Sequence, residues 1–91
     1  MTIYWTNEAL TDVAEIREYL LNTNPERAEQ LVESFFDRVQ QASNFPKMGR
    51  LYRQGELPQV RELLVSNYRI TYYVGLGQLD VMTVRHQARQ R

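Results

Sequence analysis

Apolar residues recur every three or four positions in two stretches of the first half of the chain, positions 10–21 and 28–42. This spacing places them on one face of an amphipathic helix, and acidic residues fall largely on the opposite face. Between the two stretches, Asn24 is a good helix cap and Pro25 is preorganised for a first helical turn. The pattern therefore predicts two helices joined by a short turn, a helical hairpin over residues 7–44.

The segments that flank this hairpin have different patterns. Residues 2–6 are rich in β-branched and aromatic side chains, which predicts a strand, and Asn7 is expected to cap the helix that follows. Pro46 prevents the second helix from continuing. Residues 45–57, with two glycines and several basic residues, are expected to form a loop.

The second half of the chain alternates apolar and polar residues with the period of two that is typical of strands. Two turns, Ser66-Asn67 and the glycine turn at 75–78, interrupt the alternation. Strands joined by such short turns pair antiparallel. The pattern predicts a three-stranded antiparallel β-meander within residues 58–86, followed by a C-terminal tail at 87–91. The expected strands are Gln59–Val65, Tyr68–Val74 and Leu79–Arg85.

Together these elements predict an α+β fold, in which an N-terminal strand, a helical hairpin and a three-stranded antiparallel meander form a single domain over residues 1–91. The chain has 91 residues and is 43% hydrophobic, enough to bury one core but not two. The helices must pack on one face of the sheet to bury their apolar stripes, which leaves the other face open. The core is expected to include Trp5, Leu10 and the Phe35-Phe36 pair.

Alternation along the middle strand assigns its side chains to the two faces of the sheet. Tyr68, Ile70 and Tyr72 are expected to face the helices. Arg69 and Tyr73 are then expected on the open face, where the tyrosine could stack on a nucleic-acid base.

Arginines of the neighbouring strands are expected on the same open face as Arg69. Arg61 lies in the preceding strand, and the last strand offers either Arg85 or His86, which alternate between the two faces. If these side chains converge, they could hold a phosphate backbone. As the only histidine, His86 could in addition transfer a proton.

Charge is divided between the two halves of the chain, although the formal net charge is zero. Residues 1–46 hold three arginines and eight acidic residues, a net charge of −5, and residues 47–91 hold eight basic and three acidic residues, a net charge of +5. Arginine, whose guanidinium grips phosphate or carboxylate with two prongs, supplies most of the basic residues. The division predicts a basic working surface on the strands. The alternative is local neutralisation, with Arg61 paired to Glu62 or Asp80.

Several classes of site are excluded by composition. The chain has no cysteine and one histidine, so a disulfide scaffold is ruled out and a transition-metal site is not expected. No cofactor motif is present. The first residues lack the basic and apolar stretches of a signal peptide, and no run approaches the ~20 apolar residues of a membrane helix. We expect a cytoplasmic protein without membrane contact.

Three stretches, in the same order along the chain, resemble toxins of the RelE/ParE superfamily. They are Tyr4-Trp5-Thr6 with Ala9-Leu10-x-Asp12, then Phe45-Pro46-x-x-Gly49-Arg50, then Val60-Arg61-Glu62-Leu63 with Tyr68-Arg69-Ile70-x-Tyr72. The resemblance covers almost the whole chain. It implies two helices packed on a mainly antiparallel sheet.

The resemblance further implies the toxin of a type II toxin–antitoxin pair. Its partner would be a cognate antitoxin protein, and the toxin would reach operator DNA only through that partner. ParE-like members of the superfamily poison DNA gyrase, whereas RelE-like members cut messenger RNA on the ribosome. Residues 59–65 lack the paired lysines of the nuclease branch and residues 87–91 contain no aromatic residue. These departures favour the ParE-like branch, with the ribosome-dependent endoribonuclease as the alternative.

Site residues are also implied by the resemblance. On the nuclease alternative, the catalytic residues would be Arg61, Arg69 and His86. Phosphate or RNA contacts are expected from Arg50, Arg61, Arg69 and Arg85. Antitoxin contacts are expected from Tyr73, Arg85 and Arg89. No residue is expected to bind a metal.

Overall fold

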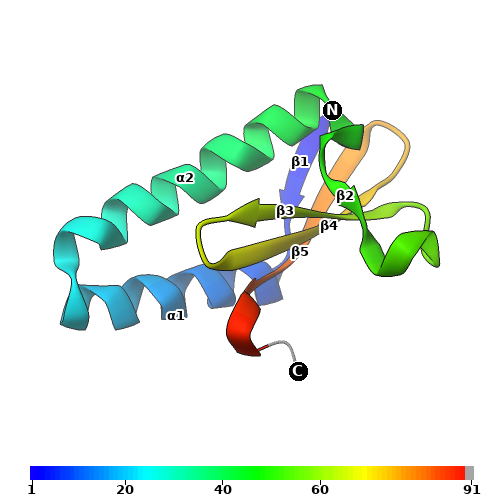
Figure 1. Ribbon diagram of the computed structural model, residues 1–91. Helices are drawn as coiled ribbons and strands as arrows, with labels where there is room; N and C mark the ends of the chain where they lie inside the picture. Colours follow the sequence, from blue (N-terminus) through cyan, green and yellow to red (C-terminus); the bar gives the residue numbers. More distant parts are fainter. Residues whose placement is uncertain (90–91) are drawn as a thin grey trace.

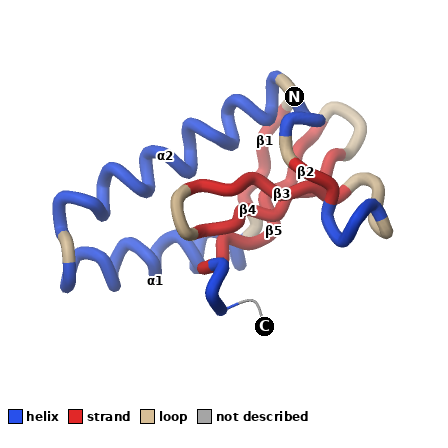
Figure 2. Tube along the Cα trace, in the orientation of Figure 1, coloured by secondary structure: helices blue, strands red, loops and turns tan. Residues whose placement is uncertain are grey.

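A computed structural model describes residues 1–89, without the side chain of Arg89. Two helices lie against one face of a five-stranded sheet, and the tip of their hairpin extends beyond the sheet (Figures 1 and 2). The elements are β1 (Thr2–Trp5), α1 (Asn7–Thr23), α2 (Pro25–Asn44), β2 (Arg50–Leu51), β3 (Val60–Val65), β4 (Tyr68–Val74) and β5 (Gln78–His86). Short 3₁₀ turns occupy Pro46–Met48, Tyr52–Gly55 and Gln87–Arg89.

The predicted helical hairpin and antiparallel meander are confirmed, with one change at the first helix. The side chain of Thr6, and not that of Asn7, caps α1, because its Oγ1 accepts a hydrogen bond from the amide of Ala9 at 3.1 Å. Asn7 is already the first helical residue. Asn24 caps α2 and Pro25 opens it, as expected.

The sheet has the strand order β1-β5-β4-β3-β2. The meander forms its centre, and β1 joins β5 as a parallel edge strand. The opposite edge, β2, lies in the segment 45–57 that was expected to be a loop without strands, and it pairs antiparallel with β3 (Figure 2). A strand of two residues has no periodicity from which a sequence pattern could reveal it.

A β-bulge at Met82 changes which face the end of β5 presents. Val81 pairs with Tyr72, but Thr83 pairs with Thr71, so Met82 is the extra residue. Strict alternation would put Val81 and Val84 on opposite faces, whereas both are buried against the helices. The bulge therefore places each following residue of β5 on the face opposite to the one that strict alternation would give it.

The core lies between the helices and one face of the sheet. It is formed by Ala9, Val13, Leu20, Ala28, Leu31, Phe35, Val39, Ala42, Leu63, Val65, Tyr68, Ile70, Tyr72, Leu79, Val81 and Val84. Two residues expected in it lie at the surface instead: Leu10 is 45% exposed and Phe36 43% exposed. Phe36 packs on the ring of Trp5 at the border of the core, with the ring centroids 4.7 Å apart.

The segment before β2 is fastened to the sheet by a buried tyrosine. The Tyr72 hydroxyl donates to the carbonyl of Pro46 at 2.7 Å and accepts from the amide of Gly49 at 3.0 Å. The guanidinium of Arg61 donates to the Gly49 carbonyl at 2.8 Å. Arg61 therefore helps to hold the segment before β2 in place, on the helix-covered side of the sheet.

Gly49→Ala is expected to destabilise the fold by about 1–3 kcal/mol, because a Cβ at this position would meet the Tyr72 hydroxyl at 2.5 Å and the Glu62 carbonyl at 2.7 Å. Urea unfolding measures the change. Gly75→Ala is the matched control, since the nearest atom to its Cβ would be 3.4 Å away. Equal losses in the two variants would contradict the proposed contact.

Tyr72→Phe is expected to lower the free energy of unfolding at neutral pH by about 1–2 kcal/mol, because Gly49 and Pro46 lose a buried partner. Burial raises the pKa of Tyr72 above its ordinary value of 10.0, against the opposing hydrogen bond from Gly49. The folded state therefore holds this proton more tightly, and its contribution is complete below about pH 10 and lost as the pH rises through the higher folded pKa. Unfolding titrations should show the difference between wild type and variant shrinking above about pH 10; a constant difference would contradict this.

Candidate functional site

The open face of the sheet carries a groove of about 630 Å³. Strands β3, β4 and β5 form its floor, and the segment around the turn Tyr52–Gly55 forms one wall. Its lining combines charged and hydroxyl side chains with apolar ones: Glu8, Tyr52, Arg53, Leu57, Val60, Glu62, Arg69, Thr71, Met82, Thr83 and Arg85. We call this the open-face groove.

A buried carboxylate organises the open-face groove. Glu62 is only 5% exposed, and two guanidiniums hold it: Arg69 Nη1 donates to Oε2 at 3.1 Å and Arg50 Nε donates to Oε1 at 3.2 Å. The Nε atom of Arg69 is itself buried and makes no hydrogen bond within residues 1–89. Arg69 is thus oriented by Glu62 and keeps one donor without a partner.

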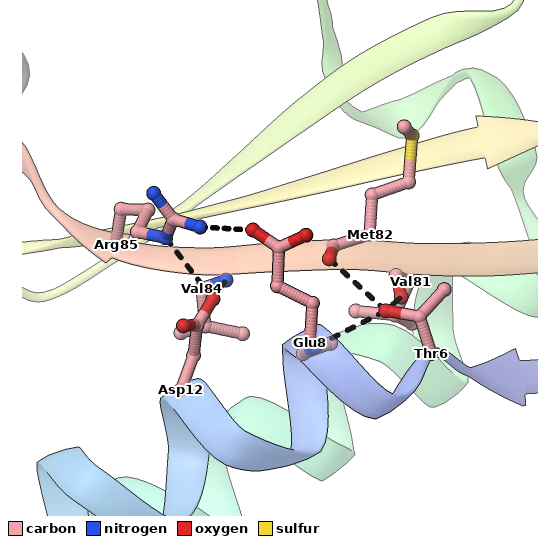
Figure 3. A network of polar contacts seen from close by, with 8 residues as sticks. Thr6, Glu8, Asp12, Val81, Met82, Val84 and Arg85 are labelled. Carbon is pink, nitrogen blue, oxygen red and sulfur yellow. Dashed lines mark hydrogen bonds and ion pairs between the residues drawn. The ribbon is translucent and has the colours of Figure 1, made fainter.

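Arg85 enters the open-face groove from β5 and is held by helix α1. Its guanidinium pairs with Glu8, and its Nε donates to Oδ2 of Asp12 at 3.1 Å (Figure 3). The hydrogen bond that Arg85 donates to Asp12 raises the pKa of Arg85 above its ordinary value. Arg85 is therefore a fully charged group whose charge is already compensated.

The start of α1 and its cap also form hydrogen bonds with the backbone of β5, past the point where β1 ends. Asp12 Oδ2 also accepts from the backbone amide of Val84 at 2.9 Å. Thr6 Oγ1 lies 2.9 Å from the carbonyl of Val81 and 3.0 Å from that of Met82, to which its single proton can donate (Figure 3). The side chains of Asp12 in α1 and of its cap Thr6 thus replace hydrogen bonds that a longer β1 would make.

The expectation that Arg61 shares a face with Arg69 is wrong, and of the two last-strand candidates Arg85, not His86, lies on that face. Arg61 lies opposite Tyr72 in the ladder and His86 lies opposite Tyr68, so both are on the helix-covered face. For His86 the reason is the bulge at Met82, and for Arg61 it is the register of β3.

The sequence-predicted residues therefore divide into two groups. Arg50, Arg69, Tyr73 and Arg85 lie on the open face, and Tyr73 is 38% exposed there. Arg61 and His86 lie on the other face. Arg89 ends the last 3₁₀ turn, and its side chain lies outside the described residues.

His86 lines a second, smaller groove of about 300 Å³ between α1 and the end of β5. Its ring stands edge-on to the ring of Tyr68, with centroids 5.1 Å apart. We call this the His86 groove; it is lined by Asp12, Glu15, Ile16, Tyr19, Tyr68, Val84, Arg85 and His86.

Sequence reasoning missed the acidic members of both sites. Glu62 was considered only as a partner of Arg61 and as a letter of the motif Val-Arg-Glu-Leu, Asp12 only as a letter of Ala-Leu-x-Asp, and Glu8 only within the acidic first half of the chain. Their presence inside motifs rich in apolar residues was the available signal, because an acid in such a setting needs a cationic partner. The predicted alternative, a pair of Arg61 with Glu62 or Asp80, is wrong, because Glu62 pairs with Arg50 and Arg69 and the guanidinium of Arg61 donates to backbone carbonyls.

Within residues 1–89, no group of three or more histidine, aspartate or glutamate side chains is placed to hold a metal ion. Over the same residues, neither helix is long and apolar enough to cross a membrane.

Comparison with known proteins places the chain among bacterial toxins. The model of a family described as the ParE toxin of the parDE type II toxin–antitoxin system matches residues 3–91. "Toxin RelE2" of Caulobacter vibrioides is 32% identical over 88 residues, which cover 96% of each chain.

Two solved structures share the fold. A chain from the chromosomal ParDE system of P. aeruginosa has a TM-score of 0.78 at 21% identity and covers 94% of this chain and 95% of its own length. The YoeB/ParE toxin from Agrobacterium tumefaciens has a TM-score of 0.67 at 22% identity and covers 94% and 98%. These similarities show a shared fold, which in this chain is the α+β class predicted from the sequence.

Glu62→Gln is expected to lower the free energy of unfolding by about 2–3 kcal/mol, because the largely buried guanidinium of Arg69 loses its counter-charge. Chemical denaturation measures the loss. Glu29→Gln is the matched control, since it breaks the exposed pair with Arg17 and should cost less than about 1 kcal/mol. A Glu62→Gln variant as stable as this control would show that the ion pairs of Glu62 contribute little to the free energy of unfolding.

Proposed function

Because the chain belongs to the ParE toxin family of type II toxin–antitoxin systems, we propose that it arrests growth by poisoning DNA gyrase and that a cognate antitoxin neutralises it. The observation that carries the choice of gyrase is the division of the nuclease candidates between two faces. Arg69 lies on the open face, and Arg61 and His86 lie on the other. A protein that acts by binding its target needs no convergent catalytic group.

Electrostatics also oppose a phosphate beside His86. The His86 groove contains the carboxylates of Asp12 and Glu15, and the one arginine in its described lining, Arg85, is already paired with Asp12 and Glu8. A negatively charged backbone would be repelled there. A general acid or base at His86 would therefore act where RNA binds poorly.

For gyrase, the helical hairpin and the C-terminal segment are the proposed contacts. The tip of the hairpin extends beyond the sheet (Figure 1) and presents large side chains to solvent, with Tyr19 59% and Leu21 39% exposed. The exposed face of α2 adds acidic side chains to the hairpin, among them Glu29 and Glu33. An exposed apolar group with a charged rim is typical of a surface for a protein partner.

For the antitoxin, the open-face groove is the proposed docking surface. Tyr73 and Met82 offer exposed apolar area on this face, and Arg85 offers charge at its border. We also propose Arg89, an expected antitoxin contact in the sequence analysis, as a further contact with the antitoxin. Operator DNA would be bound through the antitoxin, and all these partners would be met in the cytoplasm.

The RelE-like endoribonuclease is the second candidate, and one observation favours it. Arg69 has a buried Nε without a partner and faces the open-face groove, where a scissile phosphate could lie. The name of the relative Toxin RelE2 points the same way. On this alternative Arg50, Arg69 and Arg85 would contact RNA, while Arg61 and His86 would have to act from the other side of the sheet.

Purified toxin is expected to inhibit supercoiling by gyrase at micromolar concentration or to trap cleaved DNA, and addition of antitoxin should restore activity. In cells, DNA synthesis should stop before protein synthesis after induction, as pulse labels would show. Arg61→Ala and His86→Ala should leave gyrase inhibition intact if they retain the fold by circular dichroism. Untouched gyrase together with early arrest of translation would overturn the proposal in favour of the nuclease.

A further inference from the structure

The His86 groove holds several hydrogen-bond acceptors that the fold does not use. Tyr68 is 8% exposed, and its hydroxyl makes no hydrogen bond within residues 1–89. The hydroxyl oxygen is not fully enclosed, so it can be reached from outside. Since Tyr68 lines the groove, its oxygen is an acceptor available there. Asp12 uses only Oδ2 for Val84 and Arg85, so its Oδ1 is a second acceptor.

The charge of the groove favours a cation. Among the described residues that line it, Arg85 is the one arginine, and Asp12 and Glu15 supply two carboxylates. Glu8, which also pairs with Arg85, lines the open-face groove. One guanidinium and two carboxylates leave the described lining with an excess of negative charge. A second cation can therefore enter beside Arg85, whereas phosphate and carboxylate ligands are disfavoured.

The remaining walls suit a guanidinium on an aliphatic stem. Ile16 and Val84 supply apolar surface, and Tyr19 supplies an aromatic ring. The ring of His86 is held in place on two sides, by its edge-on contact with Tyr68 and by Nδ1, which accepts from the amide of Ala88 at 3.1 Å. Arginine stacks on aromatic rings and bonds carboxylates with its planar fork, which lysine cannot do.

We propose that the His86 groove binds an arginine side chain supplied by the cognate antitoxin. This inference rests on the proposed docking of the antitoxin in the open-face groove. Arg85 lines both grooves, so a chain that leaves the open-face groove beside Arg85 meets the His86 groove next. The arginine would bond Glu15 and the Tyr68 hydroxyl with its stem against Ile16.

The site is tested first with a small probe on the full chain. N-acetylarginine amide should shift the NMR signals of His86 and Tyr68 in a saturable manner, whereas the isosteric but neutral N-acetylcitrulline amide should not. Glu15→Gln should weaken binding of the arginine probe about fivefold. Glu18→Gln is the matched control, since Glu18 is an exposed glutamate of the same helix that does not line the groove. Equal shifts with both probes, or none with arginine, would overturn the site.

The occupant is tested in the toxin–antitoxin complex. Glu15→Gln and Tyr68→Phe should each raise the dissociation constant several-fold, whereas Glu18→Gln should leave it unchanged. Exchange of one antitoxin arginine for citrulline should abolish the sensitivity to Glu15→Gln. A wild-type complex indifferent to both groove variants would overturn this inference alone. Absence of any complex with wild-type toxin would instead overturn the proposed function, and with it the antitoxin as occupant.

Discussion

A carboxylate withdrawn from water must find positive charge, and Glu62 is the place where this constraint shapes the molecule. At 5% exposure its charge is tolerated only because Arg50 and Arg69 both donate to it. Arg50 belongs to β2, so its ion pair with Glu62 connects the edge strand to the sheet. Arg69 is fixed over the open-face groove by the same carboxylate. One buried charge therefore positions both a structural edge and the residue at the centre of the candidate site.

The division of charge along the chain takes a different meaning in the folded molecule. From the sequence, the acidic first half and the basic second half suggested two separate surfaces. In the structure they meet, because Glu8 and Asp12 of α1 hold Arg85 of β5 (Figure 3). The acids of the first turns of α1 are thus part of the site, whereas those further along the hairpin remain at the surface. The net charge of a segment does not predict which side chains will pair, because pairing depends on how the fold brings distant segments together.

The same reasoning explains which parts of the structure the sequence could predict. The hairpin and the limits of β4 follow from periodicity and turn chemistry, which are local. The faces of Arg61 and His86 depend on strand register and on a single extra residue at Met82, which leave no trace in an alternating pattern. A one-residue error in phase moves a side chain through the sheet, so a catalytic group predicted by alternation can be placed on the wrong face. The split of the nuclease candidates has this origin.

The arginines of the open face differ in how easily they can be recruited by a partner. Exposed ion pairs contribute about 0–1 kcal/mol, so a partner that offers a carboxylate can take Arg85 from Glu8 at little cost. Arg69 is different, because removing it would leave the buried charge of Glu62 with Arg50 alone. A ligand of Arg69 must therefore add to the pair with Glu62 through the exposed part of the guanidinium, since Nε itself is buried, and cannot replace Glu62. The open face thus combines one fixed cation with one that can exchange partners, an arrangement better suited to docking a protein segment than to closing around a reacting phosphate.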